Sequence, residues 1–152
     1  MGLFNDTEAK RNCKLTCQPA RSGVLGAILH GTQQPREDAM IVRALSDVPS
    51  ISITEAGARD TTVQWLLKAE DGMPTFAMRH FVVKPGGRTP RHAHAWEHEL
   101  FILQGMCSIF CEGETRVVGP EHAVYIQPDA IHSFANDGVD DLIFLCMIPV
   151  GS

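Results

Sequence analysis

Short apolar runs separated by turn-forming residues dominate this chain from about residue 40 onward. Regularly spaced short strands with turn signals between them are typical of an all-β sandwich or barrel. Few windows repeat apolar residues at helical spacing, so we expect little helix. The runs are rich in Val, Ile, Phe, Leu and Thr and cover residues 51–54, 61–68, 75–84, 99–104, 107–111, 115–118, 123–127 and 141–148.

The first 40 residues differ from the rest of the chain because they show no clear hydrophobic period. They begin polar, contain one short apolar patch at residues 23–30, and continue into the loop-like sequence GTQQPRED. The total length of 152 residues suits a single domain with a modest extra segment. We therefore expect an N-terminal arm or extra strands over residues 1–40 and one β-barrel domain over residues 41–152.

Two of the expected strands, residues 100–103 and 142–148, are apolar at consecutive positions. An antiparallel strand with one face in water alternates instead, so both faces of these strands should be covered. The barrel interior covers one face, and either the first 40 residues or a second subunit covers the other. Symmetric pairing is common and apolar patches of this size seldom stay exposed, so we expect a homodimer.

Charge and composition argue against several other partners. The net charge of −5 and the scattered basic residues predict no nucleic-acid binding. No apolar stretch approaches the roughly 20 residues that cross a bilayer, so we expect no membrane partner. The first residues lack the apolar region of a secretory signal, and the five cysteines are an odd number. We therefore expect a cytoplasmic protein with reduced thiols.

Three of the seven histidines fall within the sequence HAHAWEH at residues 92–98. Side chains two apart on a strand share a face, so His92 and His94 should point the same way, and His98 shares their parity. Crowded imidazoles repel unless a cation organises them, and neutral imidazole is a favoured ligand of transition metals. His132 can reach the same place from a neighbouring strand. The cluster therefore predicts one divalent transition metal per chain, bound by His92, His94, His98 and His132.

The spacing of these residues resembles the two sequence motifs of the cupin superfamily. The first motif is matched by Gly86, His92, His94 and Gly105, and the second by His132 and Asn136. The resemblance covers about residues 60–150 and implies a jelly-roll β-barrel with the metal in its mouth. The second motif departs from the family pattern, because Glu121 and Asp129 replace two of its glycines.

The first motif departs from the family pattern at its fourth ligand. Counting back from Gly105 reaches His98 rather than the usual glutamate, as in the small single-domain cupins that hold manganese with four histidines. A competing register places the glutamate ligand at Glu99. The spacing to Gly105 and the strand parity both favour His98, since one register cannot point both side chains inward.

Four neutral ligands leave a divalent ion its full +2 charge at a site of low dielectric. We expect such a site to prefer an anionic or chelating small molecule, for example a carboxylate, enolate, diketone or catechol. Manganese or iron with six ligands keeps two adjacent positions open, whereas tetrahedral zinc is already saturated by four histidines. We expect manganese first and iron second, with nickel, copper or zinc as alternatives, since the order of affinities alone favours copper or nickel.

Arg79, His80 and Tyr125 are further candidates for contact with a substrate. Arg79 and His80 are neighbours on the expected strand 75–84, so only one of them faces the barrel interior. Tyr125 is the only tyrosine and could donate a proton, although a tyrosine on a strand more often packs.

These expectations combine into a metal-dependent enzyme that acts on a small anionic or chelating oxygenated molecule. Oxidoreductase chemistry of the dioxygenase type is our first hypothesis. A non-redox isomerase, cyclase or lyase that uses the metal as a Lewis acid is the second. A non-catalytic barrel that binds a small molecule is the third.

Overall fold

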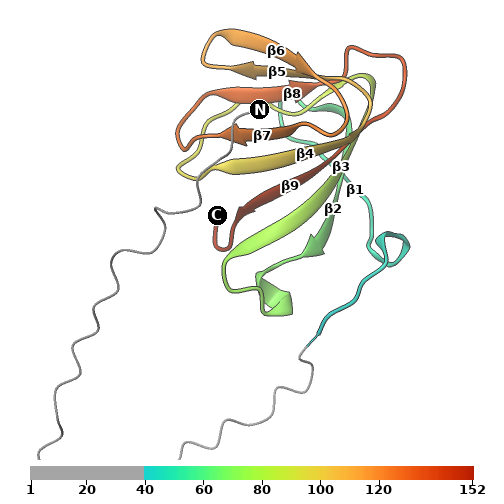
Figure 1. The fold of residues 1–152 in the computed structure, drawn as a ribbon, viewed down its shortest axis with the longest axis vertical. Helices are drawn as coiled ribbons and strands as arrows, with labels where there is room; N and C mark the ends of the chain where they lie inside the picture. The colour runs from blue at the N-terminus through green and yellow to red at the C-terminus, as the bar shows by residue number, and fades with distance from the viewer. Residues whose placement is uncertain (1–39) are drawn as a thin grey trace, which may run out of the picture. The chain divides into compact units, whose positions relative to one another are not determined.

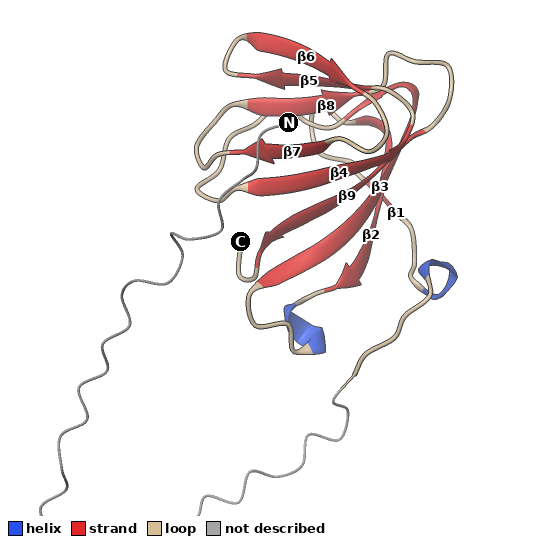
Figure 2. Ribbon diagram, viewed as in Figure 1, coloured by secondary structure: helices blue, strands red, loops and turns tan. Residues whose placement is uncertain are grey.

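The computed structural model describes residues 40–152, and these residues are mostly β-structure (Figure 1, Figure 2). Two short 3-10 turns, η1 (Leu45–Asp47) and η2 (Ala69–Asp71), are the helical elements of the described part of the chain. Neither is long and apolar enough to cross a membrane. The strands are β1 (Ile51–Ser52), β2 (Arg59–Leu67), β3 (Phe76–Arg88), β4 (His98–Gln104), β5 (Cys107–Cys111), β6 (Glu114–Val118), β7 (Ala123–Ile126), β8 (His132–Ala135) and β9 (Leu142–Pro149).

The all-β prediction is confirmed, and each of the eight apolar runs contains a strand. β8, the strand expected at His132, lies outside the apolar runs, because its four residues, HSFA, contain one large apolar side chain and are too few to show a period. The expected arm over residues 1–40 lies, apart from Met40, outside the described residues.

The strands form one curled antiparallel sheet in the order β6-β5-β8-β3-β9-β4-β7, with β2 added to β3 and β1 to β2. β3 joins the two parts of this sheet, because most of its length pairs with β2 and β9 while Arg88 at its end pairs with Ala135 of β8. The sheet wraps around an interior (Figure 1). This arrangement confirms the expected jelly-roll barrel.

Alternate side chains of the central strands fill the interior. Leu100 and Ile102 of β4 and Phe144 of β9 are at most 1% exposed. The ring of Phe144 stacks on that of Phe81 of β3, with 4.9 Å between the ring centroids. Burial of each such side chain contributes roughly 1.5–3 kcal/mol. This apolar core supports the interior surface on which the candidate site lies.

The outer faces of β4 and β9 explain why these strands are apolar at consecutive positions. Phe101 and Leu103 point away from the interior and are 39% and 45% exposed. Leu145 and Met147 of β9 are half-buried on the same outer face. Whether a second copy of the chain or the first 40 residues cover this face stays a prediction.

Both motifs contain residues with left-handed backbone. Gly86 and Gly105 have φ angles of 74° and 76°. A Cβ atom at Gly105 would lie 2.6 Å from the carbonyl oxygen of Asp141, so only glycine fits there. Glu121 and Asp129, which replace the family's glycines, keep positive φ angles of 66° and 64°. Both positions therefore adopt left-handed backbone without glycine, at a cost in backbone strain that is greater for Glu121 than for Asp129.

Replacement of Glu121 with glycine should stabilise the domain. Left-handed backbone costs a side-chain-bearing residue roughly 1–2 kcal/mol, and the extra chain entropy of glycine offsets roughly 0.5–1 kcal/mol of that gain. We expect the free energy of unfolding, measured by urea titration, to rise by about 1 kcal/mol. Glu114→Gly is the matched control within β6 and should lower it. A decrease in Glu121→Gly would contradict the strain argument.

Candidate metal centre

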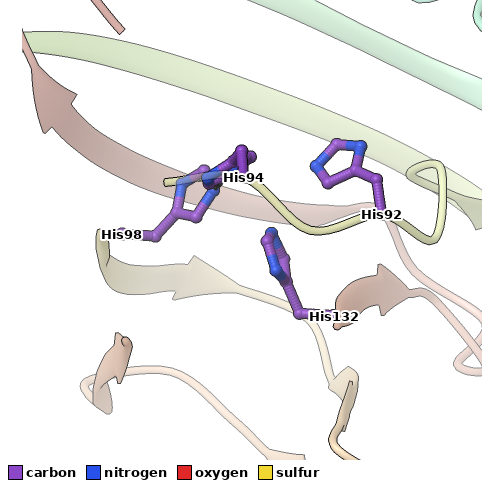
Figure 3. Close-up of side chains that lie close together, drawn as sticks. All are labelled: His92, His94, His98 and His132. Atoms are coloured by element: carbon purple, nitrogen blue, oxygen red, sulfur yellow. Dashed lines mark hydrogen bonds between the residues drawn. The ribbon is translucent and has the colours of Figure 1, made fainter. Parts of the chain in front are cut away.

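The four histidines predicted to bind metal converge on one point (Figure 3). His98 begins β4 and His132 begins β8, whereas His92 and His94 lie in the loop between β3 and β4. Neighbouring ring centroids are 4.6 Å apart for His94 and His98 and 5.2 Å apart for His92 and His94. One nitrogen from each ring lies within 4.8 Å of the nitrogens of the other three.

Backbone hydrogen bonds, rather than strand parity, position the two loop histidines. The amide of His92 donates to the carbonyl of His132 at 3.1 Å, and the amide of His132 donates to the carbonyl of His92 at 2.9 Å. The carbonyl of His94 accepts a hydrogen bond from the amide of Asp129 at 2.8 Å. Strand parity therefore does not describe His92 and His94, which lie in a loop, although both side chains reach the cluster.

Asn136 connects the loops that carry the two motifs. Its side chain is 0% exposed and donates to the carbonyl oxygens of Val83 and Asp140, at 2.8 Å each. Its side-chain oxygen accepts from the amide of Gly138 at 3.0 Å. Its backbone carbonyl accepts from the amide of Gly86 at 2.8 Å. A buried amide with all these partners holds the loops in one arrangement.

The ring nitrogens of His94 and His132 are oriented as metal ligands require. Nδ1 of His94 donates to the carbonyl of Trp96, and Nδ1 of His132 donates to the carbonyl of Ala130, at 2.8 Å each. A carbonyl only accepts, so Nδ1 carries the proton and Nε2 keeps its lone pair. Nε2 of His132 is buried and has no hydrogen-bond partner among the described residues. An unsatisfied lone pair directed into an imidazole cluster fits a divalent transition metal.

His98 has two polar neighbours behind its ring. Its Nδ1 lies 3.1 Å from Sγ of Cys146 and 3.3 Å from Nη2 of Arg79. Its Nε2 lies 2.7 Å from Nε2 of His94, a distance at which two lone pairs need a proton or a cation between them. Cys146 therefore helps to orient a candidate ligand. The sequence did not indicate this role, because a cysteine within an apolar strand is ordinarily a core residue.

Burial keeps the clustered imidazoles neutral. It lowers the pKa of His98 to about 2, with the nearby Arg79 guanidinium as the next cause. Burial also lowers the pKa of His92 and of His132. The rings of His92, His98 and His132 are therefore unprotonated at neutral pH, which is the form that binds metals.

Acidification should destabilise the metal-free protein. Above pH about 6.5, the histidines are neutral in both the folded and the unfolded chain. Below this pH, the unfolded chain binds protons that the folded chain does not bind, so the free energy of unfolding falls as pH decreases. The urea midpoint of chelator-treated protein should therefore be lower at pH about 5.5 than at about 7.5. His132→Gln should reduce this difference, whereas His122→Gln, at an exposed histidine, should preserve it. An unchanged or higher midpoint in acid would contradict the argument.

The structure places His98 and Glu99 on opposite faces of β4. His98 is 5% exposed and contributes to the cluster, whereas Glu99 is exposed. The described residues therefore agree with the histidine register rather than with the alternative in which Glu99 is the ligand.

Replacement of His98 should weaken metal binding far more than replacement of Glu99. Substitution of a residue that hydrogen-bonds to a metal ligand lowers metal affinity roughly 10–100-fold. The loss of a ligand itself should therefore lower it about 100-fold or more. We expect His98→Ala to raise the Kd for Mn²⁺ by that factor, and Glu99→Gln to leave it within about threefold. Titration calorimetry measures both values. A larger effect of Glu99→Gln would restore the glutamate register.

A cavity of about 300 Å³ lies beside the histidine cluster and is lined by His92, His98 and His132. Most of the remaining lining is apolar. The lining also includes one guanidinium and one carboxylate, and both come from strands or loops remote from the histidines in sequence. The aromatic and charged side chains of the lining are Trp65, Phe81, Phe134, Phe144, Arg79 and Glu55.

The three further candidates have different positions. Arg79 faces the interior and lines the cavity. His80 points from the opposite face of β3 and is 7% exposed. Tyr125 is 62% exposed and does not line the cavity. Sequence reasoning missed Trp65 and Glu55, because nothing in their local sequence indicates that β2 and the loop before it reach the histidines.

Comparisons with known proteins agree with this geometry. A family model described as "Cupin domain" matches residues 79–148. The comparison with curated proteins finds no match.

Several solved structures are similar to the chain. The polyketide cyclase RemF from Streptomyces resistomycificus is 34% identical, with a TM-score of 0.67, over 72% of this chain and 80% of RemF. A cupin-2 domain protein from Rhodospirillum rubrum is 28% identical, with a TM-score of 0.63, over 72% of this chain and 74% of that protein. A predicted oxalate decarboxylase from Thermotoga maritima is 23% identical, with a TM-score of 0.65, over 73% of this chain and 99% of that protein. At that identity, the last similarity shows the fold alone.

Proposed function

Since this chain belongs to the cupin superfamily, we propose that it is a metal-dependent enzyme acting on a small oxygenated molecule that is anionic or chelating. One observation carries the proposal: four imidazole nitrogens lie within 4.8 Å of one another, and three of these histidines, His92, His98 and His132, line a cavity of about 300 Å³. A cavity of this size suits a small ligand, and polar groups that converge on an apolar pocket are typical of binding sites.

We propose manganese or iron for the four-histidine site, with nickel, copper or zinc as alternatives. A divalent ion bound there supplies Lewis acidity to the oxygen atoms of a substrate. Because all four ligands are neutral, they leave the charge of the ion uncompensated, which favours an anionic partner. The Nδ1 hydrogen bonds of His94 and His132 fix the ring orientations for this role.

The similarity to RemF changes the order of our two enzyme hypotheses. RemF is a polyketide cyclase, and this chain covers 80% of it at 34% identity. We therefore place non-redox chemistry of the cyclase, isomerase or lyase type first. In this proposal, an aromatic wall formed by Trp65, Phe81 and Phe134 of the cavity lining orients a flat substrate and excludes water. The carboxylate of Glu55, the acidic side chain of the lining, is the group that accepts a proton from the substrate.

Oxygen-dependent oxidoreductase chemistry of the dioxygenase type is the second candidate. The all-nitrogen ligand set favours it, because four protein ligands leave an ion that prefers six ligands room for both a substrate and dioxygen. The two hypotheses place the same residues around the substrate and differ in whether oxygen is consumed.

The cytoplasmic location is also part of the proposal. Three cysteines lie among the described residues, and none of them forms a disulfide: Cys107, Cys111 and Cys146. Reduced thiols are typical of a cytoplasmic protein, which supports this location.

Metal content and oxygen dependence test the proposed function. Elemental analysis of protein purified without added metal should find about one manganese, iron or similar ion per chain. Within a panel of 1,3-diketones, enolisable aryl ketones and catechols, the ketones should then be turned over equally with and without oxygen. Turnover should be lost on chelation and restored by Mn²⁺.

Three other outcomes would favour a different function or overturn the proposal. Turnover that stops without oxygen would favour the dioxygenase-type candidate. Tight binding without any turnover would favour the non-catalytic barrel. Protein that is purified without metal and fails to bind any on titration would overturn the proposal.

A further inference from the structure

Arg79 brings a positive charge to the wall of the cavity, directly behind a candidate metal ligand. It lies on β3, opposite Trp65 of β2 and Cys146 of β9. Its Nη2 is 3.0 Å from Sγ of Cys146 and 3.3 Å from Nδ1 of His98. Its guanidinium carbon lies 5.3 Å from the ring centroid of Trp65 and 5.1 Å from that of Phe81.

No anionic side chain of residues 40–152 forms an ion pair with Arg79. The ion pairs of this part of the chain involve Arg43, Lys68, Lys84 and Arg116. Among these residues Arg79 donates one hydrogen bond from Nη2, to Sγ of Cys146; Nη2 also lies close to Nδ1 of His98, and Nε is buried without a partner. Glu55 also lines the cavity, but it forms no ion pair with Arg79. Arg79 is half-buried and has no ion-pair partner among these residues, so an anion that enters the cavity would gain a charge-assisted hydrogen bond from it.

The metal centre does not account for this guanidinium. An ion held by four neutral imidazoles repels a second positive charge, so Arg79 weakens metal binding rather than strengthening it. The contact between Cys146 and His98, at 3.1 Å, needs no guanidinium to orient the ring. The remaining source of compensation is a molecule in the cavity.

We propose that Arg79 determines substrate specificity by binding the carboxylate of a small planar aromatic acid. The ring of this acid lies against the aromatic wall formed by Trp65, Phe81 and Phe134, and its carboxylate reaches the guanidinium. The cavity of about 300 Å³ accommodates a single ring with its substituents. Oxygen substituents at the other end of the ring face the histidine cluster, and this last part of the inference rests on the proposed function.

Two probes that differ by one carboxylate test this proposal on the full chain loaded with Mn²⁺. They are 3,4-dihydroxybenzoate and catechol, and calorimetry measures their Kd values. The wild-type chain should bind 3,4-dihydroxybenzoate at least about tenfold more tightly, as expected for a charge-assisted hydrogen bond. Arg79→Gln should abolish this preference, and Arg79→Lys should retain part of it. Arg116→Gln is the matched control, because it removes the same charge from a side chain that is 81% exposed, and it should retain the full preference.

Metal affinity separates substrate binding from a structural role. The Kd of Arg79→Gln for Mn²⁺ should equal or fall below that of the wild-type chain, since a repelling charge has been removed. A weaker affinity together with a lost preference would show that Arg79 positions His98 and would overturn the proposal. Equal binding of both probes by the wild-type chain would also overturn it, without any variant.

A second pair of probes keeps this inference separable from the proposed function. Benzoate and benzamide differ in charge, and they can be titrated into chelator-treated chain whose fold is verified by circular dichroism. A preference for benzoate that disappears in Arg79→Gln would support the carboxylate site even if the chain bound no metal. The absence of such a preference in the wild-type chain would rule out the carboxylate site at Arg79 even if the metal centre were confirmed.

Discussion

The mutual backbone pairing of His92 and His132 is the constraint on which the site depends. It joins a loop to the first residue of β8 through two hydrogen bonds, of 3.1 and 2.9 Å. Neutral imidazoles do not gather spontaneously, so the backbone and the buried amide of Asn136 must hold the two motif segments together. Among residues 40–152, Nε2 of His132 has no hydrogen-bond partner, and a metal ion bound in the cluster would supply one.

The charged and neutral groups around the site together favour a negatively charged ligand. The four proposed ligands are neutral, and burial keeps His98 in that form by lowering its pKa to about 2. The guanidinium of Arg79 adds positive charge to the same wall, whereas Glu55 is the single carboxylate of the lining. A site of this composition stabilises negative charge on a bound molecule more than it stabilises a neutral one. The aromatic side chains around Arg79 then favour a flat molecule over an extended polar one.

The strands and the histidine set could be predicted from the sequence because both depend on local patterns. Apolar runs between turn residues indicated eight of the nine strands, and β8 lies outside these runs because four residues carry no period. Spacing also assigned His98 rather than Glu99 to the cluster. Strand parity does not explain why His92 and His94 reach the cluster, because both lie in a loop. Backbone hydrogen bonds to other segments hold this loop in place. The left-handed backbone at Glu121 likewise depends on tertiary context, because glutamate does not favour it.

The sequence alone determined the fold class and the four histidines, because residue type and spacing encode these properties directly. The neutrality of His92, His98 and His132 instead depends on their burial in the tertiary structure. Only the tertiary structure decided that Arg79 faces the cavity while His80 lies on the other face of β3. It also brought Trp65, Glu55 and Cys146 to the histidines from distant parts of the chain. The physical reason is that a strand's inward face is set by its register with its neighbours, and a shift of one residue reverses every side chain.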